Sequence, residues 1–284
     1  EYVLFGDFKI NIISADNCNP ELCGLYFGCG VVETSFGSTQ IDTLSVFKDE
    51  NHVVVNTNDC PFELSKSSLD VILSQYNVID LLLVGYAGAG PYPQCFELSK
   101  EDMVKAASDK QNQFINQATN FIKNLKPKYF MPFAGTYVLG GELSKLNEFR
   151  GVPELHEALR LIHANLQSIE SMGVLLNEYE YFDLLSDSSS MDYVPISLHE
   201  KEEYIQKVLS LKKYEYQENE LPELGLLLDL IVPSFNRFLE KRKSIGFYSE
   251  TFVIIDLVDE KRLEFSCDSE QFNIVDSDFP LPTS

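Results

Sequence analysis

Three short stretches carry residues able to do chemistry, and each follows an apolar run. In the first, three valines at 53–55 lead through Asn-Thr-Asn to Asp59. A carboxylate just beyond a strand lies where open α/β layers bind ligands, so Asp59 could be a metal ligand or a general base. The alternative is that Asp59 only stabilises the turn into the next helix, where aspartate is common. Composition alone favours this structural alternative.

The second stretch, residues 84–96, contains three glycines, two prolines and two tyrosines after another apolar run. Glycines such as Gly88 and Gly90 let a backbone approach a ligand closely. Tyr86 and Tyr92 offer both a ring face and a hydroxyl. A tight connection between a strand and a helix explains the same residues, and the sequence does not decide between the two interpretations.

The third stretch, residues 126–137, is again an apolar run that enters a glycine turn, with Phe133 and Tyr137 at its end. The ends of parallel strands meet at one edge of a sheet. The three stretches together therefore predict a ligand site more strongly than any one of them does. Its substrate-binding candidates are Tyr86, Gly88, Gly90, Tyr92, Phe133 and Tyr137.

Strands and helices alternate in the part of the chain that must position these residues. β-rich runs occupy residues 8–14 and 24–33, and residues 39–47 and 52–56 form a predicted hairpin. A helical pattern follows to Tyr76 with Ser65 as its N-cap, and then a strand at 78–84 that should be buried on both faces. A capping box at Ser99 opens a long helix to Leu125, and a strand follows at 128–133. This alternation predicts an α/β layer.

Beyond residue 135 the patterns become mostly helical. Helices are predicted at residues 153–168, 198–211 and 222–243, the last kinked at Pro233, and strands at 252–258 and 262–266. A serine-rich polar stretch at 187–191 is the best linker candidate. We therefore expect two regions, residues 1–190 and a helical extension with terminal strands at 191–284.

Charge and cysteine usage narrow the possible partners. The formal net charge is −22, with 44 acidic and 22 basic residues. Such a surface disfavours nucleic acid and anionic membrane as partners, and no apolar run approaches the roughly 20 residues of a membrane helix. The spacing of the six cysteines (Cys18, Cys23, Cys29, Cys60, Cys95 and Cys267) predicts reduced thiols and a cytoplasmic protein.

The three stretches together resemble the later half of the metallo-β-lactamase fold. The runs Val-Asn-Thr-Asn-Asp-Cys, Tyr-Ala-Gly-Ala-Gly-Pro-Tyr-Pro-Gln-Cys-Phe and Lys-Pro-Lys-Tyr-Phe-Met-Pro-Phe-Ala-Gly are similar to those of CMP-N-acetylneuraminate hydroxylases and their bacterial relatives. The resemblance covers residues 8–155. It implies a four-layer αββα sandwich with a metal centre at one edge, where Asp59 matches the bridging metal-ligand aspartate.

The chain also departs from that family's pattern. The cluster of histidines with an aspartate does not occur, and Ala134 stands where many relatives have a final histidine ligand. The four histidines are His52, His156, His163 and His199, and none are spaced to chelate from one loop. A catalytic zinc site uses about three protein ligands. Because only Asp59 can be placed, we expect this chain to bind a catalytic metal weakly or not at all.

The resemblance implies part of a metal-dependent hydrolase or oxygenase with a small-molecule substrate. The chain begins with Glu1 rather than Met, so we expect an upstream segment or a second chain to complete a zinc or iron site. The alternative is a non-catalytic module that keeps the fold to bind a ligand or partner. Metal content discriminates between the two.

Overall fold

The computed structural model describes residues 2–14, 42–167 and 169–278. These residues form two compact units. The first contains the described residues up to Lys213, and the second begins at Tyr214. The predicted strand at residues 24–33 and the cysteines Cys18, Cys23 and Cys29 lie outside the described residues.

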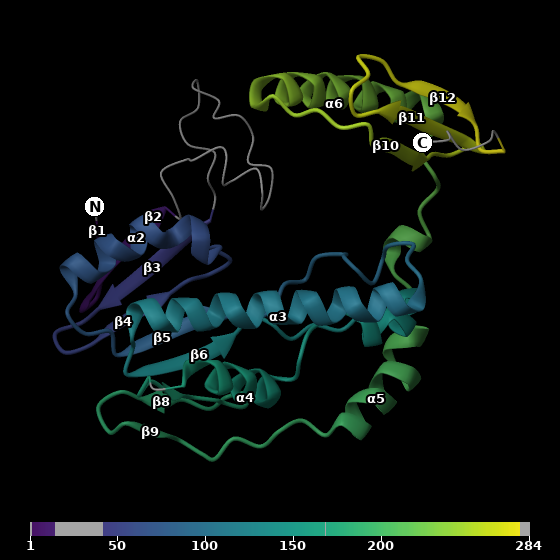
Figure 1. Cartoon of the computed structure of the whole chain (residues 1–284). Coiled ribbons are helices and arrows are strands. Elements are labelled where there is room, and N and C mark those ends of the chain that lie inside the picture. Colours follow the sequence, from purple (N-terminus) through teal and green to yellow (C-terminus); the bar gives the residue numbers. More distant parts are fainter. Residues whose placement is uncertain (1, 15–41, 168, 279–284) are drawn as a thin grey trace. The chain divides into compact units, whose positions relative to one another are not determined.

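The first unit is built on a seven-stranded sheet whose strands follow one another in chain order (Figure 1). They are β1 (Tyr2–Phe5), β2 (Phe8–Ser14), β3 (Thr43–Lys48), β4 (Val53–Asn56), β5 (Leu81–Gly85), β6 (Tyr129–Phe133) and β7 (Met172–Gly173). Neighbours are antiparallel from β1 to β4 and parallel from β4 to β7. The predicted hairpin is confirmed as β3 and β4. The mixed α/β class is also confirmed, although the described residues contain one large sheet and not the two of a sandwich.

A helix follows each of β4, β5 and β6, as parallel pairing requires. These helices are α2 (Phe62–Gln75), α3 (Lys100–Leu125) and α4 (Leu155–Leu166). The capping box of α3 is confirmed, because the Ser99 side chain accepts a hydrogen bond from the Asp102 backbone N–H. Ser65 as an N-cap was wrong: α2 begins one turn earlier, and the Ser65 hydroxyl donates to the Pro61 carbonyl oxygen inside the helix.

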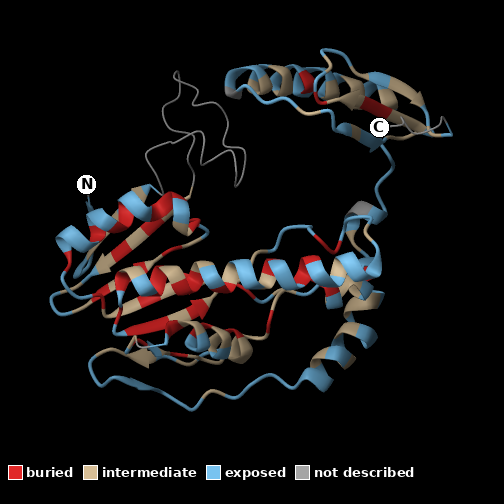
Figure 2. Cartoon of the chain, viewed as in Figure 1, coloured by how far each residue is buried: buried red, intermediate tan, exposed pale blue. Residues whose placement is uncertain are grey.

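The core lies on one face of the sheet (Figure 2). Alternate residues of β3, β4 and β5 are buried, among them Leu44, Val55 and Leu82, and they pack against apolar residues of the three helices. The residues between them are only half-buried, so β5 has one buried face and not the two predicted. The half-buried positions with apolar side chains are Phe47, Val54, Leu81, Leu83, Met131 and Phe133.

The segment that follows β7 stays attached to the sheet. It forms a small hairpin, β8 (Phe182–Asp183) with β9 (Ser188–Ser189), in which the Phe182 ring meets that of Tyr129 at 4.8 Å. Asp187 pairs with Lys128 at 2.7 Å. These contacts hold the serine-rich stretch to the start of β6. Further along, Lys201 is ion-paired with Glu154, and the compact units divide after Lys213. Helix α5 (Leu198–Lys207) also belongs to the first unit.

The second unit pairs helix α6 (Leu224–Ile245) with a three-stranded sheet. Pro233 lies inside α6, as predicted. The strands are β10 (Phe252–Asp256), β11 (Lys261–Ser266) and β12 (Asn273–Asp276), of which the sequence patterns missed the last. Phe235 of α6 packs its ring against Phe265 and Phe272 at about 5 Å, which fixes the helix to its own sheet.

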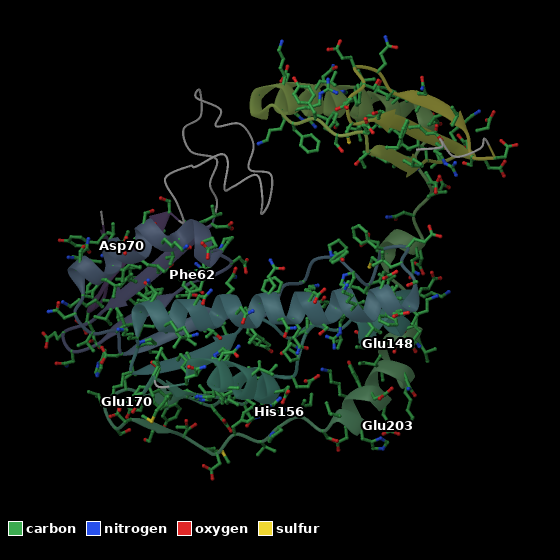
Figure 3. The ribbon with its side chains drawn as sticks, in the orientation of Figure 1. Phe62, Asp70, Glu148, His156, Glu170 and Glu203 are labelled. Carbon is green, nitrogen blue, oxygen red and sulfur yellow. The ribbon has the colours of Figure 1, made fainter. Side chains whose placement is uncertain are left out.

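Acidic side chains are spread over the first unit. Asp70, Glu148 and Glu170 are exposed and come from different parts of the chain (Figure 3). In the part of the chain that the structure describes, no helix combines the length and the apolar character that crossing a bilayer requires.

Candidate functional site

The three predicted stretches lie at the same edge of the sheet. β4, β5 and β6 are adjacent and parallel, and Gly85 at the end of β5 is paired with Phe133 at the end of β6. The Asn58 carbonyl oxygen lies 3.5 Å from the position that a Cβ on Gly85 would take. We call residues 57–60, 85–96 and 133–137 the carboxyl edge. The predicted grouping of Asp59, Tyr86 and Ala134 at one edge is confirmed, whereas their roles stay predictions.

The turn that carries Asp59 is held firmly by its neighbours. Asn58 adopts a left-handed conformation (φ 46°), its side-chain amide donates to the Thr43 carbonyl oxygen at 2.6 Å, and its backbone N–H donates to Asn56 Oδ1 at 2.9 Å. Asp59 itself is exposed. The residue that caps α2 is Pro61, without a side-chain hydrogen bond, so Asp59 does not have the capping role that the structural alternative assigns to it.

Two predicted ligand-binding residues serve the packing of the edge. Tyr86 is only 1% exposed, and its hydroxyl lies 2.7 Å from that of Thr136. Burial raises the pKa of Tyr86. A Cβ on Gly135 would lie 2.4 Å from the Tyr86 ring, and one on Gly88 would lie 2.3 Å from the Phe114 ring. Both glycines are therefore needed for close packing inside the edge.

Other predicted residues face solvent. The rings of Tyr92 and Phe96 meet edge to face at 5.2 Å, and each side chain is about half exposed. A Cβ on Gly90 would meet nothing within 4 Å. Ala134, with φ 52°, is also exposed, while Phe133 is half-buried. This part of the edge therefore exposes two aromatic rings to solvent.

Four polar side chains that were not predicted as a group lie together beneath this surface. Lys110 of α3 donates to the carbonyl oxygens of Gly90 at 3.3 Å and Tyr92 at 2.8 Å. Gln94 donates to the same Gly90 oxygen at 2.8 Å and to the Tyr137 hydroxyl at 3.4 Å. The Arg150 guanidinium lies over the Tyr137 ring, 5.3 Å from its centroid. We call Gln94, Lys110, Tyr137 and Arg150 the buried cation cluster.

The buried cation cluster is removed from water. Gln94, Lys110 and Arg150 are 2%, 9% and 7% exposed. Desolvation lowers the pKa of Lys110, and the charge of Arg150 lowers it further. Burial also lowers the pKa of Arg150 and raises that of Tyr137. One signal in the sequence could have found Lys110, because it shares a helical stripe with the buried Ala106 and Ala107.

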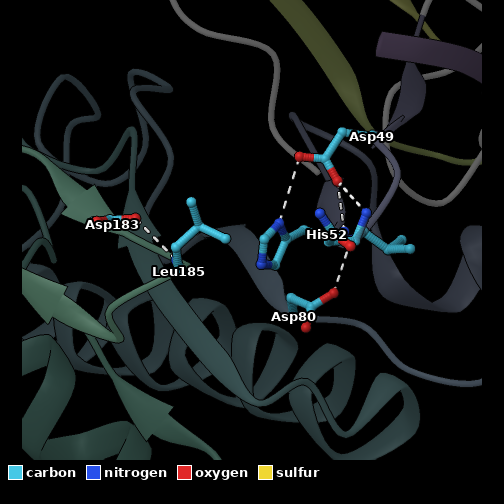
Figure 4. A network of polar contacts seen from close by, with 7 residues as sticks. Asp49, His52, Asp80, Asp183 and Leu185 are labelled. Carbon is cyan, nitrogen blue, oxygen red and sulfur yellow. Dashed lines mark hydrogen bonds and ion pairs between the residues drawn. The ribbon is translucent and has the colours of Figure 1, made fainter. Parts of the chain in front are cut away.

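The opposite edge of the sheet carries a second polar group (Figure 4). His52 precedes β4, and its Nδ1 lies 3.4 Å from Asp49 Oδ2, while Asp80 accepts a hydrogen bond from the Val53 backbone N–H at 2.8 Å. A cavity of about 330 Å³ lies beside it, between the half-buried sheet face and residues 182–185. We call Asp49, His52, Asp80, Lys128 and Asp187 the amino-edge group.

The described residues do not form a complete metal site. No group of three or more His, Cys, Asp or Glu side chains among them is arranged to hold a metal ion. His52 lies at the opposite end of β4 from Asp59, and His156 and His163 belong to α4, where the His163 ring packs against Phe130. Asp59 is thus the one predicted ligand that the structure places at the carboxyl edge.

The chain matches no known family and no curated protein. Among solved structures it is similar to CmlA, a diiron beta-hydroxylase from Streptomyces venezuelae, with 12% identity and a TM-score of 0.33. This match covers 61% of the chain and 31% of CmlA. A protein of unknown function from Enterococcus faecalis V583 matches with 10% identity and a TM-score of 0.18, over 63% of this chain and 44% of that one. Likenesses this distant show neither the family nor the activity of the chain.

Proposed function

We propose that the chain contributes the later, substrate-binding half of a metal-dependent hydrolase or oxygenase of the metallo-β-lactamase superfamily. The observation that carries the proposal is the Asp59 carboxylate. It is exposed on a firmly held turn, beyond a strand end, and it does not cap the following helix. An exposed carboxylate on such a turn, with no capping role, suits metal ligation. The substrate we propose is a small molecule bound at the carboxyl edge.

One carboxylate does not make a metal centre, and the described residues do not fit a zinc or iron ion by themselves. The proposal therefore requires ligands beyond the described residues, and we propose that a segment upstream of residue 1 or a second chain supplies them. It also places the protein in the cytoplasm, on the grounds of its cysteine spacing. No step of a reaction can be assigned to the residues described.

The test compares metal content and apo stability in the protein that includes any upstream histidines. For wild type and Asp59→Asn, elemental analysis follows purification without chelators, and thermal unfolding is measured on the apo form. If Asp59 is a ligand, the substitution lowers metal stoichiometry and leaves apo stability equal or higher, because a carboxylate near other ligands is relieved of repulsion. Asp70→Asn on the exposed face of α2 is the matched control and should keep both properties.

The opposite result would make Asp59 a structural residue. A turn or cap aspartate costs roughly 0.5–2 kcal/mol of stability when it is replaced, and it leaves metal content unchanged. That outcome removes the main support for the proposed function.

A second candidate function is a non-catalytic module that binds a ligand or partner. It is favoured by the finding that no three metal-ligating side chains come together in the described residues. It predicts that the protein contains no stoichiometric zinc, iron or manganese, even when any upstream segment is included. Metal content therefore separates the two candidates without knowledge of the substrate.

A further inference from the structure

The buried cation cluster contains more positive charge than its surroundings neutralise. Within the described residues neither Lys110 nor Arg150 has a carboxylate within ion-pair distance, although the chain carries a net charge of −22. Glu154, which influences Arg150 electrostatically, is itself ion-paired with Lys201. Burying a cation without a counter-ion is unfavourable, so the cluster calls for an explanation beyond packing.

Several hydrogen-bond donors of the cluster also have no acceptor in the described residues. Arg150 donates from Nε to the Asn147 carbonyl oxygen at 3.0 Å, whereas its Nη1 is buried without a partner in the described part of the chain. The Tyr137 oxygen is placed to accept from Gln94, which leaves the hydroxyl hydrogen available, and Lys110 uses two of its three N–H groups. Three unused donors, two of them on cations, are suited to bind anionic oxygens.

These groups converge because the chain holds them at one place. Gln94 and Lys110 both bind the Gly90 carbonyl oxygen, and Gln94 links to Tyr137, over whose ring Arg150 lies. Gly151 fixes Arg150 against α3: with φ 64° it brings the backbone so near that a Cβ would lie 2.4 Å from the Ala107 carbonyl oxygen. Ala107 lies one helical turn before Lys110.

We propose that the buried cation cluster binds the anionic group of a small molecule, a carboxylate or a phosphate. The ligand enters past Gly90, where the space beside the backbone is open, and its body lies against the exposed Tyr92 and Phe96 rings. Gln94 Oε1 is buried without a partner in the described residues, so it accepts a hydrogen bond from a hydroxyl or N–H group next to the anion. That this ligand is the substrate rests on the proposed function. In that case the substrate is a small molecule that carries a carboxylate or a phosphate.

Calorimetric titration tests the proposal with two probes, inorganic phosphate and glycolate, a small hydroxy acid. Each is titrated into the wild-type chain at constant ionic strength, with sodium chloride as the reference. Arg150→Lys keeps the charge but loses the planar fork, so affinity should fall at least about ten-fold. Lys110→Met should cause a similar loss. The matched control is Arg160→Lys on the exposed face of α4, which should bind as wild type does.

A measurement on wild type alone guards against variants that fail to fold. The side-chain amide signal of Gln94 in NMR spectra should shift on addition of the probe that binds. Binding of phosphate alone indicates a phosphate ester, and binding of glycolate alone indicates a carboxylate. If neither probe binds to wild type, or if Arg150→Lys and Lys110→Met both bind as tightly as wild type, the proposal is overturned.

The two proposals fail in different ways. The titration involves no metal ion and does not change Asp59. If the protein binds a probe through Arg150 but contains no metal, the anion site is supported and the metal-dependent function is contradicted. If Asp59→Asn lowers the metal content but wild type binds neither probe, the metal-dependent function is supported and the anion site is contradicted.

Discussion

The two edges of the seven-stranded sheet differ in how many of their polar and charged groups have a hydrogen-bond or ion-pair partner. In the amino-edge group each carboxylate has a partner, since Asp49 accepts from two backbone N–H groups, Asp80 accepts from that of Val53, and Asp187 pairs with Lys128. At the carboxyl edge, Asp59 is exposed and does not cap its helix, and Gln94 Oε1 is buried without a partner in the described residues. In the neighbouring buried cation cluster, Arg150 Nη1 is also buried without a partner in the described residues.

The two edges differ in how completely their polar groups are hydrogen-bonded or ion-paired. Both edges belong to one sheet, so they share the same core and the same strand geometry. Polar groups that are fully satisfied stabilise a fold, whereas buried groups left unsatisfied reduce its stability and are kept where function requires them. This contrast supports a structural role for the amino-edge group and agrees with the ligand site that we propose at the carboxyl edge.

The largest effect should come from Gly151, which positions Arg150 in the buried cation cluster. Gly151→Ala places a Cβ 2.4 Å from a backbone oxygen of α3, which cannot swing aside as a side chain can. We expect a loss of about 1–3 kcal/mol from overpacking in addition to about 1–2 kcal/mol for a left-handed alanine. Urea unfolding of the chain measures the sum.

Gly6→Ala is the matched control for this substitution. Gly6 has nearly the same φ, 59°, but a Cβ there meets nothing within 4 Å. It should therefore show the conformational cost alone. Equal losses of stability for the two variants would mean that the close approach of Gly151 to α3 is not needed for stability. That result would contradict the role of Gly151 in positioning Arg150.

The sequence predicted much of the order of elements, and the reasons are local. The Ser99 cap, the β3–β4 hairpin and the strand–helix alternation from β4 to β6 each depend on neighbouring residues. The shared edge followed as well, because parallel strands joined by helices must end on the same side. Burial could not be predicted in this way, because it depends on the layers around a strand, as the half-exposed face of β5 shows.

The sequence predicted the exposed residues of the candidate site but not the buried cation cluster beneath them. Glycines and aromatics in the edge loops are visible as patterns, and Asp59, Tyr92 and Gly90 do lie at the open edge. The buried cation cluster draws its members from a loop, from α3 and from residues near 137 and 150, and no spacing rule connects them. Tyr86 was predicted as a ligand contact, but Gly135 and Thr136 enclose it, and these neighbours are set by the tertiary structure.

A smaller effect is expected at the amino edge, from Asp49. Asp49→Ala removes the acceptor for the backbone N–H groups of Asn51 and His52, at 2.7 and 2.6 Å. By analogy with capping residues, the cost should be about 0.5–2 kcal/mol. Thermal unfolding at neutral pH measures it, and Glu50→Ala, an exposed change in the same turn, should cost less.

The same aspartate predicts a dependence on pH. The His52 backbone N–H is the main cause that lowers the pKa of Asp49 below its ordinary value of 3.8. A carboxylate with a lowered pKa stabilises the folded state above its unfolded pKa, and this stability is lost as the pH falls through the folded value. The difference between wild type and Asp49→Ala should therefore be constant near neutrality and shrink below about pH 4. A constant difference down to pH 2 would contradict it.

The smallest effect is expected for the ion pair of Lys128 with Asp187, whose side chains are more exposed than those of Asp49 and His52. Asp187 raises the pKa of Lys128, and Lys128 in turn lowers that of Asp187, so the attraction holds between the two ordinary pKa values. It weakens as the pH falls through the pKa of Asp187 or rises through that of Lys128. Solvent and salt screen such a pair strongly.

Lys128→Gln should therefore lower the melting temperature slightly at low salt, by less than Asp49→Ala does, and leave it unchanged at about 1 M salt. Lys123→Gln, an exposed lysine without an ion pair in the described residues, is the control and should be neutral at both salt concentrations. A large, salt-independent loss at Lys128 would mean that the pair anchors the β8–β9 hairpin through buried contacts.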